Sequence, residues 1–159
     1  MSLLDMIASS DAGSPEANYL RGGRHVIKIS RVTWRDPTPK QPKASFRIDG
    51  EILKTNSAAH ADQIGMQGTM NLGFRYPESD GPRAKRALRA CLEAATGDKV
   101  AESVLTSAKI KELIGETQPL RDAIIVVMGN EAPQEKDKSK TFTKYEVEVP
   151  TLRDLDGLI

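Results

Sequence analysis

The sequence predicts a mainly β protein with helices, in which five strands form a small barrel and a helical block lies between the third and fourth strands. Residues 44–54 and 65–76 alternate apolar and polar side chains, and this period of two is typical of strands with one buried and one wet face. Between residues 82 and 96 the apolar side chains instead recur every three or four residues, the spacing of one face of an α-helix.

The first strand is expected at about residues 24–34, after a turn at Gly22-Gly23. Apolar side chains occur on both of its faces, which predicts either a β-bulge or burial on both sides. Residues 35–43 contain three prolines and are expected to form a loop, because proline cannot donate to a strand ladder. A polar loop at residues 55–64 then leads into the third strand.

The helix is expected to begin near Asp80, with Pro82 in its first turn, and to end at Gly97. Its apolar stripe, which we expect to be buried, consists of Ala84, Ala87, Leu88, Cys91, Leu92 and Ala95. The basic residues off this stripe, expected to be largely solvated, are Arg83, Lys85, Arg86 and Arg89. A weaker helical pattern covers residues 99–115.

The fourth strand is expected at about residues 121–129, where a continuous run of β-branched side chains indicates burial on both faces. Residues 141–149 alternate again and predict a fifth strand, which Pro150 ends and the charged loop 130–140 joins to the fourth. The resulting order β-β-β-α-β-β, with an extra helix between strands three and four, is that of the OB-fold, a barrel that often binds oligonucleotides.

The chain therefore divides into three parts. We predict a flexible N-terminal arm at residues 1–18, an OB-fold-like domain at 19–150, and an acidic and hydrophobic C-terminal tail at 151–159. The arm contains a short apolar cluster, residues 3–7, that could dock on the barrel or on a partner. Because both ends are acidic or rich in Ser, Gly and Pro, residues 1–15 and 151–159 are expected either to be mobile in the free protein or to be ordered only by contacts with another chain.

Charge is distributed unevenly along the chain, although the formal net charge is only +1. Residues 21–54 hold nine Lys/Arg against three Asp/Glu, a net +6, whereas residues 1–20 and 101–159 each carry −3. A basic first hairpin between acidic ends indicates a local surface for anions. The alternative is that these charges only solvate the outer face of the sheet.

Residues that usually carry catalysis or hold metals are missing from the pattern. The single Cys91 lies on the apolar stripe, the two histidines are far apart in sequence, and no Gly-rich phosphate loop occurs. The sequence therefore predicts no enzyme, no cofactor and no metal site. It has no apolar run of about 20 residues and no basic stretch before Asp5, so we expect neither a membrane span nor a secretory signal.

Binding of a single strand requires cations for the phosphates and aromatic rings on which bases stack. The expected groove is the surface of the first three strands, flanked by the loops at 35–43 and 130–140. The basic candidates are Lys28, Arg31, Arg35, Lys40, Lys43, Arg47, Arg75, Lys138 and Lys140. Trp34 and Phe142 are the stacking candidates, while Tyr76 continues the apolar face of its strand and is interpreted as core.

Several segments resemble the OB-fold single-stranded DNA-binding proteins of bacteriophages. They are the Tyr19–Ile29 approach to the first strand, the second strand Ala44–Leu53, the third strand Gly65–Phe74 and the helix Arg83–Ala95. The resemblance implies coating of single-stranded DNA during replication or recombination, in the cytoplasm of the host. It also implies that the C-terminal tail recruits replication or recombination proteins, although this tail is shorter and less acidic than the usual one.

A second hypothesis is an OB-fold protein-interaction module, an adaptor or inhibitor of a host or replication protein. Its support is the count of only seven aromatic residues together with the near-zero net charge. The two hypotheses differ in one property, since only a DNA-binding protein is retained on single-stranded DNA in a salt-dependent manner. In either case we expect no membrane partner, while the chain could form a homo-oligomer.

Overall fold

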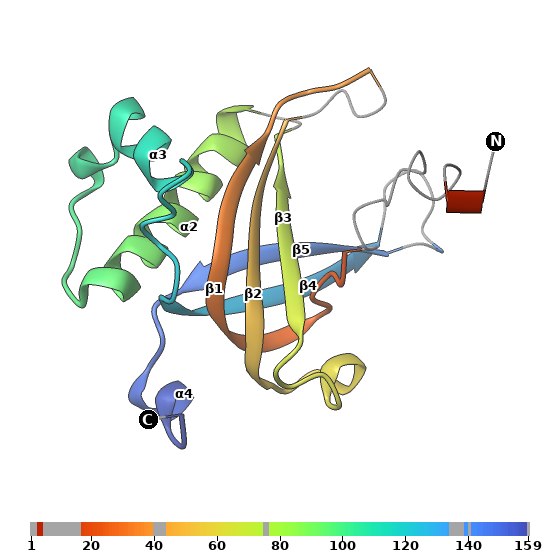
Figure 1. The fold of residues 1–159 in the computed structure, drawn as a ribbon. Helices are drawn as coiled ribbons and strands as arrows, with labels where there is room; N and C mark the ends of the chain where they lie inside the picture. The colour runs from red at the N-terminus through yellow and green to blue at the C-terminus, as the bar shows by residue number, and fades with distance from the viewer. Residues whose placement is uncertain are drawn as a thin grey trace.

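Five strands form a single antiparallel sheet in the order β3-β2-β1-β4-β5 (Figure 1). The computed structural model describes residues 3–4, 17–39, 44–74, 77–133, 139 and 141–158. The strands are β1 (Gly23–Arg35), β2 (Ser45–Thr55), β3 (Gln67–Gly73), β4 (Ile124–Pro133) and β5 (Thr141–Glu148). The helices are α2 (Pro77–Thr96), α3 (Ser107–Leu113) and α4 (Leu152–Leu155), with 3-10 turns η1 (Ala58–His60) and η2 (Glu102–Val104). The predicted mixture of five strands with a helical block after the third is confirmed.

β1 belongs to both halves of the sheet, because its N-terminal half pairs with β4 while most of its length pairs with β2. Figure 1 shows β1, β2 and β3 standing steeply across β4 and β5, so the sheet bends over on itself. The register with β2 shifts between Val26 and Ile27 and again between Ile29 and Arg31. These irregularities confirm the predicted bulge and explain why neighbouring apolar residues such as Val26 and Ile27 are both buried.

The five strands of the predicted barrel form an open sheet and do not close into a ring, since the two edge strands are not paired with each other. In the described part of the chain no ladder joins β3 to β5. The edge of β3 is instead taken by a lead-in segment, residues 17–22, which bonds to it from Leu20 N–H to Thr69 O and from Thr69 N–H to Asn18 O, both at 2.9 Å. The hydroxyl of Tyr145 on β5 donates to Leu20 O at 2.6 Å, so this segment bridges the two edges.

α2 packs its apolar stripe against the sheet, with Ala84, Leu88, Cys91 and Leu92 all less than a tenth exposed, as predicted. The stripe ends at Leu92, because the last predicted member is exposed. The predicted start near Asp80 is wrong. The helix begins at Pro77 and places Glu78 and Asp80 in its first turn, where acidic side chains interact favourably with the helix dipole. Of the four basic residues, Arg86 and Arg89 are exposed, while Arg83 and Lys85 are half-buried.

The segment between α2 and β4 covers the free edge of β1. Gly97, with φ of +77°, ends α2, and the helical pattern predicted for 99–115 appears as the short η2 and α3. Beyond the β4 pairing, the side-chain amide of Gln118 bonds both backbone groups of Val32, accepting from N–H at 2.7 Å and donating to the carbonyl at 3.0 Å. This amide replaces a neighbouring strand at a point where β1 has left β4.

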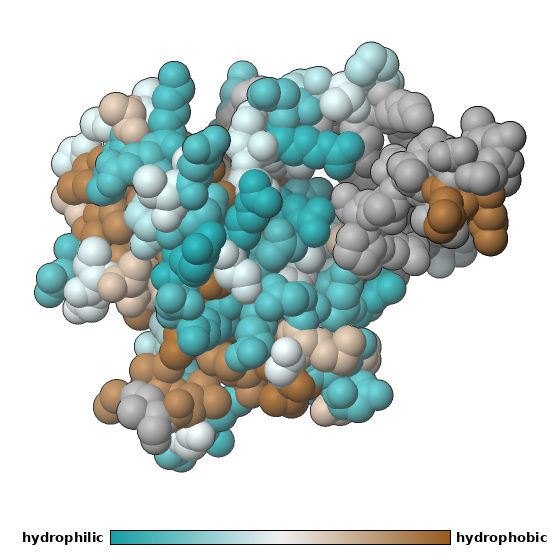
Figure 2. Space-filling view, viewed as in Figure 1, coloured by the Kyte–Doolittle hydropathy of each residue, from teal (hydrophilic) through white to brown (hydrophobic). Residues whose placement is uncertain are grey.

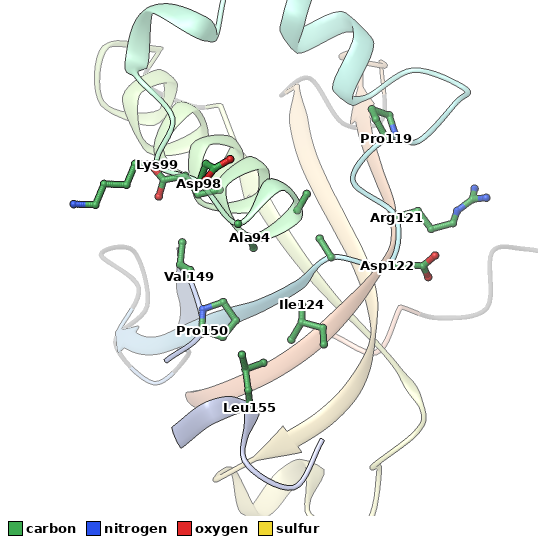
Figure 3. Close-up of a pocket in the computed structure, with 14 residues that line it drawn as sticks. Ala94, Asp98, Lys99, Pro119, Arg121, Asp122, Ile124, Val149, Pro150 and Leu155 are labelled. Atoms are coloured by element: carbon green, nitrogen blue, oxygen red, sulfur yellow. The ribbon is translucent and has the colours of Figure 1, made fainter. Parts of the chain in front are cut away.

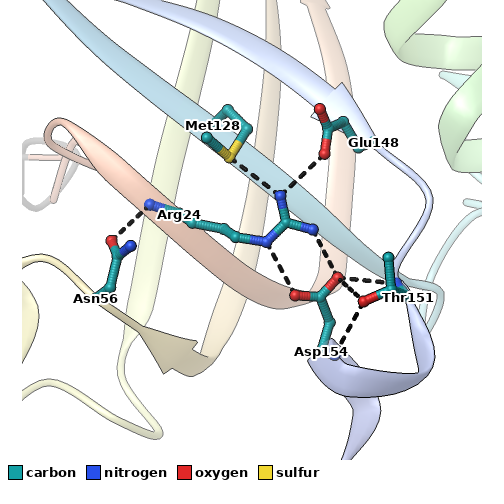
Figure 4. Close-up of polar contacts among 6 residues, drawn as sticks. All are labelled: Arg24, Asn56, Met128, Glu148, Thr151 and Asp154. Atoms are coloured by element: carbon teal, nitrogen blue, oxygen red, sulfur yellow. Dashed lines mark hydrogen bonds and ion pairs between the residues drawn. The ribbon is translucent and has the colours of Figure 1, made fainter.

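The C-terminal tail lies against its own chain, which differs from the expected mobile tail. Thr151 caps α4, and its side chain and that of Asp154 form a capping box. The Arg24 guanidinium of β1 donates to both carboxylate oxygens of Asp154, at 2.9 and 2.7 Å, and to Glu148 at 3.0 Å (Figure 4). The contact between Arg24 and Asp154, which are 130 residues apart, therefore holds the tail in place. Local sequence patterns cannot predict a contact over this distance.

The core is aliphatic, as the composition predicts, and Phe46 and Tyr145 are the fully buried aromatic residues in the described core. In the described ranges no helix has both the length and the apolar character needed to cross a bilayer. In the predicted N-terminal arm, Leu3 and Leu4 are exposed, and residues 5–16 lie outside the described residues.

Candidate nucleic-acid interface

The sheet formed by β1, β2 and β3 has one face toward the core and one face outward. Directly paired residues on neighbouring strands share a face, and successive residues along one strand alternate. One cross-strand row, fully buried, consists of Val32, Ile48 and Met70. The next row, Thr33, Arg47 and Asn71, must therefore point outward.

The outward rows together form a polar surface that we call the outer face. Its residues are Arg31, Thr33, Arg35, Arg47, Asp49, Thr69 and Asn71. Figure 2 shows mainly hydrophilic side chains over these strands. The structure thus brings three of the predicted basic residues, Arg31, Arg35 and Arg47, onto one surface, as the alternation predicts.

Arg47 is held in place by a carboxylate on its own strand. Its Nε donates to both oxygens of Asp49, at 3.0 and 3.1 Å, and a terminal nitrogen lies 3.0 Å from Oδ1. The Thr69 hydroxyl donates to the same carboxylate at 2.6 Å. This guanidinium is therefore fixed and largely neutralised, so it contributes a planar donor group more than a net charge.

Arg31 and Arg35 supply the uncompensated charge of the outer face. Both side chains are exposed, and no carboxylate within residues 17–39, 44–74, 77–133 or 141–158 lies within ion-pair distance of either. Four residues apart on one strand, they are separated by about 13 Å along β1. Lys28, the third predicted cation on β1, is instead 3.9 Å from Asp122, a carboxylate of the loop before β4.

Trp34 lies at the end of β1, in the row that includes the buried Phe46 and Leu72. It therefore faces the core side of the sheet and not the outer face that carries the arginines. Its indole remains 40% exposed, meets the Phe74 ring edge-on with centroids 5.0 Å apart, and donates to Asp36 at 2.8 Å. The aromatic pair therefore lies at this end of the sheet on its core side.

Phe142 lies on the edge strand β5, opposite Ala132 of β4, and not on β1–β3. Its side chain is 39% exposed, as its position out of phase with the apolar face predicts, and the Lys144 ammonium lies 5.6 Å from its ring centroid. Five of the predicted basic residues, as well as Tyr76, lie outside the described residues. These five are Lys40, Lys43, Arg75, Lys138 and Lys140.

Asn71 is an outer-face residue that the sequence analysis did not select. Its Oδ1 is buried and, within the described chain, accepts no hydrogen bond. An unpaired buried acceptor costs about 1–3 kcal/mol. The only available signal in the sequence was its place on the polar face of the third strand, one side chain among several.

The structure also has an apolar groove of about 740 Å³ between the end of α2, the start of β4 and the C-terminal tail (Figure 3). Ala94, Ile124, Val149 and Leu155 line it, and Figure 3 shows Lys99 and Arg121 pointing away from its interior. These two cations therefore do not converge on the groove, as the polar groups that orient a small-molecule substrate do.

Metal ligands and the single cysteine are the remaining chemical features of the described ranges. No three His, Cys, Asp or Glu side chains gather there as a metal site would require. Burial raises the pKa of the Cys91 thiol to about 12, which leaves it protonated and unreactive at neutral pH. No protein-family model matches this chain, and no curated protein has significant sequence similarity to it.

Proposed function

We propose that this protein has an OB-type fold and binds single-stranded DNA, without sequence preference, across the outer face. The observation that carries the proposal is the pair Arg31 and Arg35, two exposed guanidinium groups on one face with no carboxylate partner in the described chain. Cations left without a partner on one surface of a nearly neutral protein favour an anionic ligand.

The fold part of the proposal is supported by topology. The order β3-β2-β1-β4-β5, with antiparallel neighbours and a helix after the third strand, matches a five-stranded, partly open barrel. In OB-folds the surface of strands 2 and 3, together with the loop after strand 1 and the loop between strands 4 and 5, is the usual binding surface. Arg47, Asp49 and Asn71 occupy the corresponding strands here.

The three parts of the surface would contact different parts of a strand. Arg31 and Arg35 would neutralise phosphates, and the fixed Arg47 guanidinium beside Asn71 would donate to or stack on bases. The indole of Trp34 lies on the core side at the end of β1, so it would stack a base only where the strand wraps around that end, with about 1–3 kcal/mol for each stacked base. None of these contacts selects one base strongly, which fits a protein that coats single strands.

The proposed role is that of a bacteriophage-type single-stranded DNA-binding protein in DNA replication or recombination. It rests on the resemblance of the strand and helix segments together with the basic first hairpin. The C-terminal tail remains the proposed contact for replication or recombination proteins, with the addition that it is docked on β1 through Arg24 in the free protein.

Charge reversal on the outer face tests the proposal. Arg31→Glu and Arg35→Glu should each weaken binding to a labelled oligo(dT) by about tenfold or more at low salt, and should flatten the slope of log K against log salt by about 0.7. Arg86→Glu is the matched control, because Arg86 is also exposed but lies on α2. Equal effects of all three substitutions would show that binding depends on net charge alone and would contradict the proposed surface.

A second candidate function, a protein-interaction module, is favoured by one observation. Apart from Leu3 and Leu4 of the N-terminal arm, three large apolar residues of the described chain are more than half exposed: Ile64 at 54%, Met66 at 53% and Leu152 at 89%. In Figure 2 apolar side chains gather at the end of the molecule where α4 lies. This alternative predicts no salt-dependent retention on single-stranded DNA, and it predicts that Ile64→Ser and Met66→Ser abolish binding of a protein partner while leaving any oligo(dT) binding unchanged.

A further inference from the structure

Two buried imidazoles bond the backbone N–H and the backbone carbonyl of one residue of the lead-in segment, Arg21. The backbone N–H of Arg21 donates to Nε2 of His60 at 2.9 Å, and the carbonyl oxygen of Arg21 accepts from Nε2 of His25 at 2.8 Å. The two rings meet edge-on with centroids 5.4 Å apart. Their side chains are fully buried, with exposed fractions of 0% for His25 and 2% for His60.

The hydrogen bonds fix the tautomer of each ring. A backbone N–H can only donate, so Nε2 of His60 must be the unprotonated nitrogen, and its Nδ1–H donates to Gln63 Oε1 at 2.6 Å. A carbonyl can only accept, so Nε2 of His25 carries a hydrogen, and in the neutral ring its Nδ1 accepts from the Thr55 hydroxyl at 2.8 Å. His60 is therefore neutral in this arrangement, and a neutral His25 has both of its ring nitrogens hydrogen-bonded.

Arg21 directly follows the residue that joins the two edges of the sheet. Immediately before it, Leu20 is fully buried and bonds to Thr69 of β3 and, through its carbonyl, to Tyr145 of β5. Asn18 donates to Gln63 Oε1 at 2.9 Å and to the Gln67 carbonyl at 3.0 Å. Gln63 thus joins the imidazole of His60 to the same segment.

We propose that His25 and His60 form a pH-dependent latch, which holds the lead-in segment across the seam between β3 and β5 while both rings are neutral and releases it when they are protonated. A proton on Nε2 of His60 would point at the Arg21 N–H and abolish that bond. Two cationic rings 5.4 Å apart would in addition repel each other inside a dry environment.

The groups that face the pair come from several elements. β2 contributes the neutral Thr55, and β4 contributes Val127 opposite His25 and the carboxylate of Glu131, which accepts from Gly22 N–H at 3.3 Å. β5 contributes Tyr145, whose pKa burial raises to about 12 and which is therefore neutral throughout the range concerned. The lead-in segment itself contributes the Arg21 cation, and no carboxylate in the described chain pairs with either imidazole.

The direction of the pH dependence follows from His25. Burial lowers its pKa, more than the opposing bond to the Arg21 carbonyl raises it, and the neighbouring His60 lowers it further. His25 therefore binds a proton more readily in the released or unfolded state than in the latched state. The stabilisation by His25 is complete at a pH above the ordinary histidine pKa of about 6.5, and it is lost as the pH falls below that value. For each proton taken up, the equilibrium constant for release of the segment rises by up to about tenfold per pH unit.

Amide hydrogen exchange of the full chain, followed by NMR, tests the latch. Between pH 7.5 and 5.5, the protection factors of Leu20 and Thr69, corrected for intrinsic exchange, should fall at least tenfold. The amide of Ile29 is the internal control, because it bonds to Ala123 on the other edge of β1 at 2.8 Å. A decrease at Leu20 and Thr69 no larger than that at Ile29 would overturn the proposal.

The variant His25→Gln/His60→Gln provides the matched comparison. Glutamine can donate to the Arg21 carbonyl and accept from its N–H but does not titrate in this range, so the excess loss of protection at low pH should disappear. Should this variant fail to fold, imidazole 15N spectra of the unaltered protein decide instead. The latch requires Nε2–H on His25 and Nδ1–H on His60 at pH 7.5, and the opposite tautomer on either ring would contradict it.

Discussion

Removing the charge of Asp154 should release the C-terminal tail from β1. The Asp154 side chain is only 10% exposed and receives two bonds from Arg24, whose side chain is 31% exposed (Figure 4). Oδ2 of Asp154 also accepts from the Thr151 N–H at 2.8 Å and from the Thr151 hydroxyl at 2.9 Å, which forms the cap of α4. One carboxylate therefore serves both the ion pair and the cap.

The magnitude follows from these contacts. Hydrogen bonds to charged groups contribute about 1.5–3 kcal/mol, and loss of an N-terminal cap costs about 0.5–2 kcal/mol. Asp154→Asn keeps the size and part of the cap, so we expect the free energy of unfolding to fall by about 2–3 kcal/mol. The loss of unfolding free energy cannot exceed the free energy with which the tail docks on β1, because further weakening of the contact has no effect once the tail has detached.

Urea unfolding at pH 7 measures this change, with Asp156→Asn as the matched control. Asp156 lies in the same tail and carries the same charge but is exposed, so its substitution should change the unfolding free energy by less than about 0.5 kcal/mol. Hydrogen exchange of the α4 amides should accelerate in Asp154→Asn alone. Equal effects of the two substitutions would refute the assignment of the tail contact to Asp154.

The same contact predicts an acid-dependent release of the tail. The hydrogen bonds from Arg24 hold the pKa of the Asp154 carboxyl well below its usual range. A carboxyl with a lowered folded pKa stabilises the folded state above its unfolded value of about 3.9, and this stabilisation is lost as the pH falls toward the folded pKa. The tail should therefore stay docked at neutral pH and detach only in strong acid, well below the range in which the histidine latch opens.

Three further predictions concern the core. Leu88→Ala should cost about 2–5 kcal/mol in urea unfolding, because Leu88 is 3% exposed beneath α2, and a loss below about 1 kcal/mol would mean that the stripe faces no core. Gly129→Ala should lower the free energy of unfolding by about 1–3 kcal/mol, because the added Cβ meets the Arg21 carbonyl oxygen. Gly73→Ala is the control and should be nearly neutral, because open space surrounds this glycine. Comparable losses of unfolding free energy in the two variants would argue against the close approach at Gly129. Iodoacetamide should modify Cys91 only in unfolding concentrations of urea, and rapid labelling of the native protein would contradict its burial.

Patterns of period two and 3.6 were sufficient to predict most of the fold. The second strand was predicted within one residue of β2, and the apolar stripe of α2 was predicted almost completely, because both depend on which side chains are buried. The start of α2 was not predicted, since acidic residues before Pro82 extend the helix by a turn. The sequence also did not predict that the sheet stays open between β3 and β5. The hydrogen bonds that Leu20 and Asn18 make with Thr69 at this place join residues about 50 positions apart.

Only part of the outer face was predictable from strand alternation. Alternation places Arg31, Arg35 and Arg47 on one side, but it does not show that Asp49 neutralises Arg47 or that Asp122 approaches Lys28. Trp34 could have been assigned to the core side, since it lies two residues from the buried Val32 with no bulge between them. The histidine pair could not have been predicted, because His25 and His60 are brought together only by the pairing of β1 with β2 and the turn that follows it.

The most direct test of the central claim is a titration of the protein with labelled oligo(dT) at two salt concentrations. Each phosphate neutralised on a single strand contributes about −0.7 to the slope of log K against log salt. With roughly three to six phosphates contacted by the basic hairpin and the outer face, the slope should lie between about −2 and −4. The absence of measurable binding at low salt, or binding that does not weaken with salt, would contradict a single-stranded DNA-binding function and favour the protein-interaction alternative.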